Sequence, residues 1–568
     1  LATCVDAPSG PEGAGAGAFV IAPVFSLVGP GGERPMTAGQ ADALSAAFDQ
    51  VDRFRMVVRR AADNVVVLDT VIVVSPGASE YDLTVPISAK DNEQFLVTLT
   101  AMQGTTTLFT AENIPAAASP VGVPGSTPPA AVQIPLVYSG PGATATSVTV
   151  APLQVVLSAG GSATVGSAVK DASGAVVAGV PLAWASSPAG VATVTAAGVV
   201  TASGEGVATV TATTPTGLAA SATVYVVSGE LAYVEAGVLK VRALAGGTPA
   251  ERASGGASQP SWSPDGAKLY YVSGGQVSRA DGPPLSTGAW PSVSPDGTKL
   301  AVERGGQVWF VNDDGSEATQ GPAGTAPVWA DASTLLVGGG SVQRVRADGT
   351  GRTTVVEGSA ALPALAGDGR IASVAAGELR VTGVSRALLT GASGRPSWSP
   401  NGRWLVVGTA SGLVLVPADG SAEGVVLPAL AGASDPAFKR TGSLAPAPSV
   451  SVAGFNPDPP IPGTQVQVLG SGFDWIIRTN NRVIWPTRDG AVESTVGAVT
   501  EGSITTTMPR NVVAGQVRVQ TRAASGLLAF VPTVGSLEVS ARTPWGGALV
   551  GVGVALTGPS GPASGTTD

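Results

Sequence analysis

The side chains that carry most enzymatic chemistry are almost missing from this chain. Its 568 residues include no histidine and one cysteine, Cys4. Without histidine the chain has no Ser-His-Asp or Cys-His nucleophile, no histidine acid or base and no histidine ligand for zinc. A single cysteine excludes internal disulfides and thiolate metal clusters. These absences remove several large classes of enzyme.

Carboxylate-pair hydrolysis is the chemistry that the composition leaves open, since the chain has 40 Asp and Glu. Most of them stand in Asp-Gly turns or alternate along predicted strands, which favours solvated turn residues over a catalytic pair. The run Asn312-Asp-Asp-Gly315 lacks the spaced ligands of a calcium loop and is predicted to be a hairpin turn. We therefore predict that the protein is not an enzyme and has no catalytic, cofactor-binding or metal-binding residue.

The one cysteine offers a different kind of chemistry. Leu1-Ala-Thr-Cys4 opens the chain, and residues 1–17 are so rich in Gly and Ala that a flexible N-terminus is predicted. The four residues resemble the end of a bacterial lipobox, in which the cysteine receives a lipid. Cys4 is thus a candidate lipid-attachment site, with a free cysteine as the alternative. No run approaches the roughly 18 apolar residues of a membrane span, so membrane contact is expected only through this lipid.

Charge and composition limit the partners and the fold class. The formal net charge is −9, which argues against nucleic acid and against an anionic membrane surface as partners. Only 12% of the residues are charged, whereas 77 are Gly and 45 are Pro. Long amphipathic helical patterns are almost absent, so the sequence predicts an all-β fold with many turns.

One seven-residue phrase recurs six times between residues 260 and 442. Its copies occupy residues 260–266, 291–297, 327–333, 363–369, 396–402 and 436–442. The Pro-Asp-Gly of the best copies is turn chemistry, because Pro presets φ, Asp bonds nearby backbone and Gly accepts positive φ. Apolar runs follow, such as Leu269-Tyr-Tyr-Val272 and Leu405-Val-Val407. A period of roughly 30 to 40 residues with several strands per repeat is typical of a β-propeller.

The pattern Pro-x-Trp-Ser-Pro-Asp-Gly-x-x-Leu resembles the blade repeat of TolB-like six-bladed propellers, which implies that fold for residues 229–446. The third, fourth and sixth copies lack the Pro-Asp pair, so there the match rests on spacing. Residues 231–244 have the pattern of a second half-blade and residues 436–442 that of a first half. The two regions are predicted to pair and close the ring. Trp262 and Trp398 are predicted to be buried core residues.

Immunoglobulin-like sandwiches are predicted before the propeller. Residues 18–145 contain strand-like runs, and in one of them Phe54, Met56 and Val58 alternate with arginines. This alternation predicts a half-buried strand, and the runs together favour an immunoglobulin- or fibronectin-like β-sandwich. Residues 146–228 resemble a bacterial immunoglobulin-like group 2 domain, and this resemblance implies that Trp184 is a core residue.

After the propeller two further modules are predicted. Residues 447–534 contain Gly463-Thr-Gln-Val-Gln-Val-Leu-Gly-Ser-Gly-Phe473 and resemble an IPT/TIG immunoglobulin-like domain. Residues 535–568 resemble the opening of a carboxypeptidase-regulatory-like β domain, with strand-like runs at 537–540 and 548–556. The predicted fold is therefore all-β, with immunoglobulin-like sandwiches flanking a six-bladed β-propeller.

Each of these modules is a scaffold, and a scaffold alone does not specify function. We predict a non-enzymatic structural or interaction protein, exported to a bacterial cell surface or the extracellular space, with the periplasm less favoured. Its partners would be proteins or other copies of itself, with a glycan as a further option. Segment 535–568 would either be completed by residues beyond 568 or be paired with a neighbouring subunit, as in a filament. The alternative is a surface or periplasmic lipoprotein that binds a peptide, glycan or protein partner through its propeller.

Overall fold

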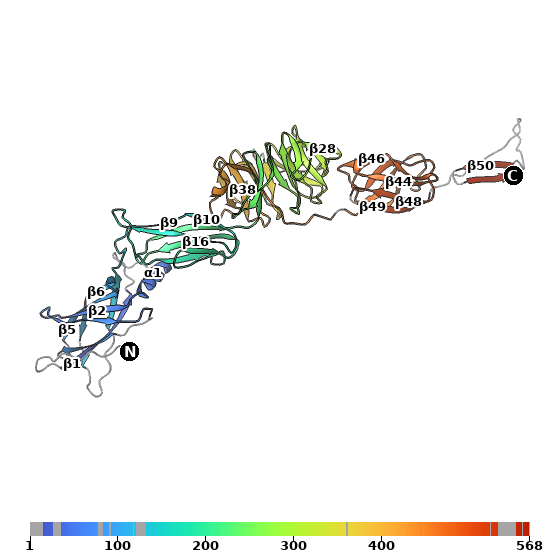
Figure 1. Cartoon of the computed structure of the whole chain (residues 1–568). Coiled ribbons are helices and arrows are strands. Elements are labelled where there is room, and N and C mark those ends of the chain that lie inside the picture. The colour runs from blue at the N-terminus through green and yellow to red at the C-terminus, as the bar shows by residue number, and fades with distance from the viewer. Residues whose placement is uncertain are drawn as a thin grey trace. The chain divides into compact units, whose positions relative to one another are not determined.

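Strands dominate the structure. The computed structural model describes residues 15–25, 36–77, 83–89, 93–117, 119–120, 132–358, 362–446, 448–522, 524–531, 553–558 and 561–566 (Figure 1). Within these residues α1 (Ala38–Phe48) is the only α-helix, so the predicted all-β class is confirmed. None of the helices in these ranges is long and apolar enough to cross a membrane. The chain divides into two compact units, Leu1–Ser228 and Gly229–Asp568.

The first unit begins with an eight-stranded sheet. Its order is β3 (Val66–Val73), β2 (Arg53–Arg60), β5 (Gln94–Gln103), β6 (Thr106–Ala117), β8 (Val132–Tyr138), β1 (Gly15–Phe25) and β4 (Leu83–Ala89), and β7 (Ser119–Pro120) pairs with β1. Phe54, Met56 and Val58 are buried on β2, as their alternation predicts. Strand β1 begins at Gly15, inside the segment 1–17 that was predicted to be flexible. The immunoglobulin- or fibronectin-like sandwich stays a prediction for residues 18–145.

Helix α1 is an element that the sequence patterns do not predict. The Thr37 side chain accepts a hydrogen bond from the Gln40 N–H (3.2 Å) and caps its N-terminus. Leu44, Ala47 and Phe48 share one face of the helix and are buried in the core of the eight-stranded sheet. Packing of this one face stabilises a helix that is too short to be stable alone.

The remainder of the first unit contains three small sheets around a second core. Their orders are β10 (Gln154–Leu157), β17 (Ala219–Val226), β16 (Gly206–Thr213), β13 (Ala183–Ser187); β11 (Ser162–Thr164), β15 (Val199–Ala202), β14 (Ala192–Val194); and β12 (Gly166–Lys170), β9 (Ser147–Ala151). Trp184 packs against this core but is only half-buried. The predicted core position is therefore corrected to the core edge, because β13 is the edge strand of its sheet.

Six four-stranded antiparallel sheets follow and are called here the six-sheet region (residues 229–438). The first sheet has the order β20 (Ala250–Ala253), β19 (Val238–Ala243), β18 (Glu230–Glu235), β41 (Ala433–Phe438), so it joins the two ends of the region. In the second to fourth sheets the strands follow chain order: β21 (Ser258–Trp262), β22 (Leu269–Ser273), β23 (Gln276–Arg279), β24 (Pro284–Thr287); β25 (Ala289–Val293), β26 (Lys299–Arg304), β27 (Gln307–Asn312), β28 (Ala318–Ala323); and β29 (Thr325–Trp329), β30 (Thr334–Gly338), β31 (Val342–Arg346), β32 (Thr353–Val356). The fifth and sixth sheets do the same: β33 (Leu362–Leu365), β34 (Ile371–Ala375), β35 (Glu378–Val381), β36 (Leu389–Thr390); and β37 (Ser393–Trp398), β38 (Trp404–Thr409), β39 (Gly412–Pro417), β40 (Val425–Val426). A short 3-10 helix, η1 (Pro428–Leu430), precedes β41.

The repeated phrase folds as its turn chemistry predicts. In the first copy the Ser263 hydroxyl donates to Asp265 (2.5 Å), whose carboxylate accepts the Ala267 N–H (3.1 Å). Gly266 has a φ of +67°, and a Cβ there would lie 2.2 Å from the carbonyl oxygen of Arg440. Glycine is therefore required at this turn both by its conformation and by its surroundings.

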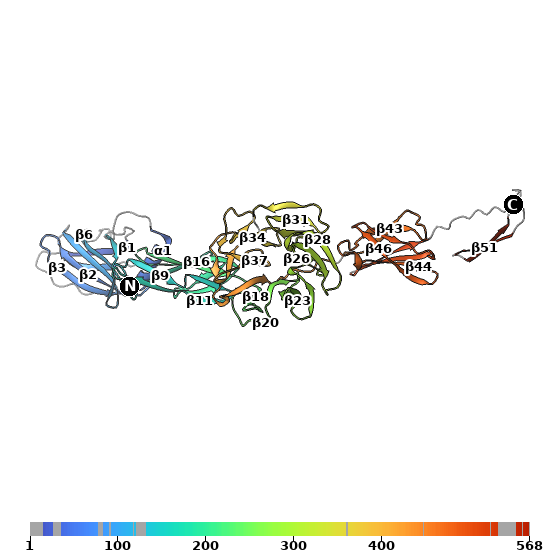
Figure 2. The ribbon, with the colours of Figure 1, turned by 90° about the horizontal axis from the view of Figure 1, so that it is seen from above.

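We call β41, β21, β25, β29, β33 and β37 the lead strands, because each carries the start of one copy of the phrase. Each lead strand contacts the lead strand of the next sheet, and β41 contacts both β37 and β21. In Figure 2 the strands of successive sheets follow one another around the six-sheet region. The predicted pairing of the regions 231–244 and 436–442 is confirmed, since β18 pairs with β41 and Leu231 faces Phe438.

Tryptophans of the repeat link neighbouring sheets. Trp398 is buried, and its indole N–H donates to the Ala364 carbonyl of β33 (3.1 Å). Trp262 makes the matching bond to Ala437 of β41 (3.2 Å) but is only half-buried. Burial is thus confirmed for Trp398 and corrected for Trp262, whose ring is covered by the Lys439 ammonium at 5.6 Å.

Two four-stranded sheets enclose a separate core after the six-sheet region and are called here the C-terminal sandwich (451–530). Their orders are β42 (Ser451–Asn456), β43 (Gln465–Ser471), β47 (Ser503–Thr507), β46 (Val496–Val499); and β45 (Gly490–Ser494), β44 (Arg482–Thr487), β48 (Gly515–Gln520), β49 (Ser525–Phe530). The buried Trp485 ring stacks on Phe455 in this core. The strand predicted at 537–540 lies outside the described residues. The run 548–556 overlaps β50 (Gly553–Gly558), which pairs with β51 (Gly561–Thr566).

Candidate functional site: a junction between the six-sheet region and the C-terminal sandwich

A loop of the C-terminal sandwich inserts a side chain into the six-sheet region. This loop, residues 473–481, lies between β43 and β44 and contains the short helix η2 (Arg478–Asn480). Ile477 has no exposed surface and packs in the same core as Phe310 and Trp329 of the six-sheet region. Hydrophobic burial of this kind is worth about 1.5–3 kcal/mol for one aliphatic side chain. Ile477 therefore anchors one module in the other.

Asp474 gives the inserted loop its shape. Its carboxylate accepts the Ile477 N–H (3.1 Å), and its own N–H donates to Asn481 (2.9 Å). The Asn481 amide in turn donates to the Asp474 carbonyl (2.7 Å). These bonds lie within the loop and fix its conformation at the junction.

A shielded ion pair lies beside the anchor. The Lys299 ammonium is 3.1 Å from the Asp474 carboxylate, and the two side chains are 13% and 10% exposed. Lys299 also affects Asp296, for which burial favours the neutral acid. The Lys299 charge and a hydrogen bond from Ser294 outweigh that burial and hold the pKa of Asp296 below its ordinary value. The positive charge of Lys299 thus stabilises the charged forms of two carboxylates, Asp474 and Asp296.

Two asparagines form a reciprocal amide pair across the junction. The Asn312 amide donates to Asn480 (2.9 Å), and the Asn480 amide donates back to Asn312 (2.9 Å). Asn480 also donates to Asp474 (2.8 Å). Because Asn312 is 1% exposed, this pair satisfies buried polar groups that would otherwise be costly.

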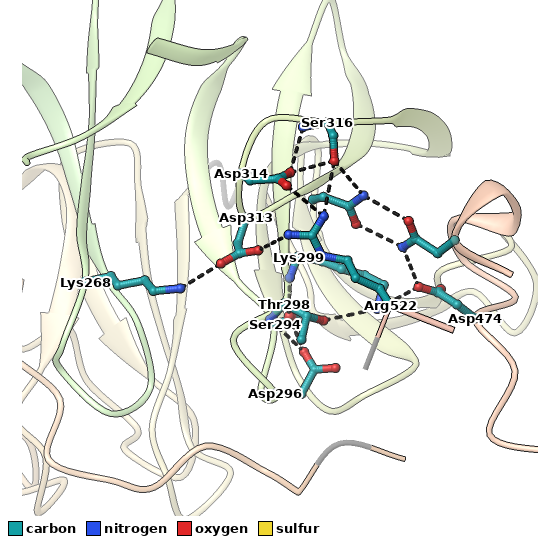
Figure 3. A network of polar contacts seen from close by, with 12 residues as sticks. Lys268, Ser294, Asp296, Thr298, Lys299, Asp313, Asp314, Ser316, Asp474 and Arg522 are labelled. Atoms are coloured by element: carbon teal, nitrogen blue, oxygen red, sulfur yellow. Dashed lines mark hydrogen bonds and ion pairs between the residues drawn. The ribbon is translucent and has the colours of Figure 1, made fainter. Parts of the chain in front are cut away.

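Arg522, which follows β48, grips the hairpin turn between β27 and β28 (Figure 3). It donates to Asp313 (3.0 Å) and to Asp314 (2.8 Å), while Lys268 donates to the second oxygen of Asp313 (2.7 Å). Burial would raise the pKa of Asp314, but hydrogen bonds from Ser316 and Arg522 and the arginine charge lower it to about 2. Asp314 therefore stays ionised over the physiological range.

A cavity of about 450 Å³ adjoins this network. Asp296, Lys299, Asp474 and Arg522 are among its lining residues, together with Trp475. The Trp475 ring also lies under the Arg346 guanidinium at 5.4 Å. The described carboxylates of the network bind cations, amides or hydroxyls, and these contacts hold protein segments together.

The structure does not place the one site residue predicted from the sequence. Cys4 lies outside the described residues, so lipid attachment stays a prediction. The run 312–315 forms the predicted hairpin turn, and its two aspartates bind Lys268 and Arg522. No cluster of three or more potential metal ligands occurs in the described ranges. The inserted loop was not singled out from the sequence, although the run Trp475-Ile-Ile477 is an apolar signal outside any strand.

Comparisons with known proteins do not show a family for this chain. No family model matches it, and no curated protein matches it in sequence. Apo AztD from Citrobacter koseri is 12% identical, with a TM-score of 0.25 over 50% of this chain and 100% of that chain. Another crystal structure of Citrobacter koseri AztD is 13% identical, with a TM-score of 0.25 over 54% of this chain and 100% of that chain. A C-terminal 282-residue fragment of intimin, in complex with the intimin-binding domain of the translocated intimin receptor, is 13% identical and has a TM-score of 0.13. The match covers 32% of this chain and 54% of that chain. Likenesses this weak carry no argument about function.

Proposed function

We propose that the protein is a non-enzymatic structural and interaction protein displayed outside a bacterial cell. The observation that carries this proposal is the junction, in which Ile477 is buried in a neighbouring module and paired charges surround it. A built junction fixes two scaffolds to each other, which a structural protein needs. In the described network Asp474, Asp313 and Asp314 each pair with a cation, which supports a structural role.

We further propose that residues 229–446 are a six-bladed propeller flanked by immunoglobulin-like sandwiches. Six four-stranded sheets with lead strands in contact support this architecture. The pairing of β18 with β41 supports closure of the ring from both ends of the segment. This pairing gives β18 a hydrogen-bonded neighbour on both sides, so β18 is not an exposed edge strand.

The display proposal is tested on the cells that produce the protein. Protease added to intact cells should release peptides of the six-sheet region, and the mature protein should carry no hydrolase or lyase activity. Mass spectrometry of the native N-terminus tests the anchor, since lipidation predicts a chain that begins at Cys4 with added diacylglyceryl and acyl mass. Full protection in intact cells, with release only after the outer envelope is opened, would refute display and favour a periplasmic location.

Assembly with other copies is the second part of the proposal. The hairpin of β50 and β51 is the described part of segment 535–568, and two strands alone make a marginal sheet. Removal of residues 535–568 should therefore abolish oligomers while the melting of the six-sheet region stays unchanged. A truncated protein that still forms the same oligomers in size-exclusion chromatography would refute assembly through this segment.

The alternative, a lipoprotein that binds a peptide, glycan or protein through the propeller, ranks second. The cavity lined by the lead strands has a volume of about 80 Å³. Typical small-molecule sites have volumes of roughly 300–1,000 Å³. A peptide or glycan would therefore have to bind on an outer face rather than between the lead strands.

A further inference from the structure

The small cavity between the lead strands has an unusual charge. Residues from all six lead strands line it, and its volume is about 80 Å³. Two arginines, Arg395 and Arg440, are among the described lining residues, whereas no Asp or Glu is. A cavity of this size holds only a few waters or one small ion.

Arg395 reaches across the six-sheet region from β37. Its guanidinium lies 5.0 Å from the Trp290 ring of β25, and one terminal nitrogen donates a long bond to the Pro327 carbonyl of β29 (3.3 Å). The Nε–H is buried and has no hydrogen-bond partner in the described part of the chain. Burial lowers the pKa of Arg395 to about 10, so the group stays charged at neutral pH in a place that disfavours the charge.

The neighbouring carboxylates leave much of this charge uncompensated. Asp435 and Glu303 attract Arg395 through space, but neither forms an ion pair with it in the described ranges. Each carboxylate accepts a backbone N–H instead: Asp435 from Gln259 (3.3 Å) and Glu303 from Ala326 (3.0 Å). Arg395 is half-buried, and its buried Nε–H has no partner in the described ranges. A shielded cation without a close partner is costly, which points to a ligand.

The second arginine and the serines complete a set of donors. Arg440 follows β41 and also lines the cavity; it is exposed to solvent, and the described residues provide it with no side-chain hydrogen bond or ion pair. Ser292 and Ser397 also line the cavity, and their hydroxyl oxygens accept the N–H groups of Trp329 (3.1 Å) and Phe438 (2.8 Å). A hydroxyl that accepts one bond still has its own hydrogen to donate.

We propose that this cavity binds one small oxyanion between Arg395 and Arg440. Guanidinium groups donate in a fixed fork that matches the oxygens of phosphate, sulfate and carboxylate. The serine hydroxyls supply further donors, and the volume admits a free inorganic oxyanion but not a peptide. The site goes beyond the proposed structural function and does not depend on where the protein is displayed.

The test titrates inorganic phosphate, sulfate and acetate into the full chain at constant ionic strength, with chloride as the reference salt. Calorimetry and thermal melting report binding, because a ligand of the native state raises the melting temperature as its concentration exceeds Kd. Arg395→Met and Arg440→Met should each weaken binding by about tenfold or more. Arg395→Lys keeps the charge but loses the fork of donors. Its affinity for the oxyanion should lie between the affinity of the two Met variants and that of the parent protein.

Arg380→Met is the matched control, because Arg380 pairs with Glu378 on the exposed part of β35, away from the cavity lining. It should bind the oxyanion like the parent protein. Without oxyanion, Arg395→Met should melt no lower than the parent protein, which shows that the variant is folded. Absence of saturable binding to the parent protein, or an equal loss in Arg380→Met, would overturn the proposal. So would parent-like affinity in Arg395→Met.

Discussion

Breaking the Lys299–Asp474 pair tests the junction most directly. At 3.1 Å the attraction between the two charges is about 5 kcal/mol with an effective dielectric constant of about 20. Breaking a buried pair typically costs about 3–5 kcal/mol, because one charge is left uncompensated. Asp474 would keep its hydrogen bonds from the Ile477 N–H and the Asn480 amide. Because these bonds still stabilise its charge, the lower end of this range of free energies applies. We therefore expect Lys299→Met to weaken the junction by about 3 kcal/mol.

Hydrogen exchange of the full chain measures this loss locally. The Ile477 and Asn480 amides are hydrogen-bonded inside the inserted loop and report its opening. A loss of about 3 kcal/mol predicts exchange on the order of a hundredfold faster at these amides. The double variant Lys299→Met with Asp474→Asn should recover part of the protection, since no unpaired charge remains.

Arg482→Met is the control for this experiment. It breaks an ion pair with Glu493 on the same sandwich, but the two side chains are 54% and 43% exposed. Exposed pairs contribute about 0–1 kcal/mol, so exchange in the inserted loop should be nearly unchanged. Equal acceleration in Arg482→Met and Lys299→Met, or none in Lys299→Met, would refute a junction held by a shielded charge pair.

Three further outcomes are expected. Trp398→Ala should cost about 3–5 kcal/mol in urea unfolding and more than Trp262→Ala, because the first ring is buried and the second is half-buried; the reverse order would contradict the sheet-to-sheet role of Trp398. The pKa of Asp314 is lowered from 3.8 to about 2, so its contribution to the junction should be complete above pH 3.8 and lost as the pH falls through about 2. Asp314→Asn should flatten this acid dependence of loop exchange, and an unchanged acid profile would show that another group is responsible. Deletion of residues 433–438 should expose the edge of β18 and lower the melting temperature of the six-sheet region, whereas an unchanged melting temperature would show that this pairing is unimportant.

Local chemistry explains which features the sequence predicts. The turn at Ser263 closes through bonds to residues two and five positions away, so a short phrase contains everything that the turn needs. The alternation of Phe54, Met56 and Val58 likewise reflects the two-residue period of a strand. Repetition of the phrase then located the lead strands. The sequence patterns did not predict helix α1, because only three residues on one short face of this helix pack in the core of its sheet.

The candidate sites required the tertiary structure. The sequence by itself determined the all-β class, the repeated turns and the absence of histidine chemistry. Only the fold decided that Asn312 meets Asn480, 168 residues away, and that Arg522 grips Asp314 from a separation of 208 residues. It also decided that Arg395 crosses to Trp290 and Pro327. No local pattern encodes such contacts, because the partners of a buried charge are set by how whole sheets pack, and burial is what makes that charge costly without a partner.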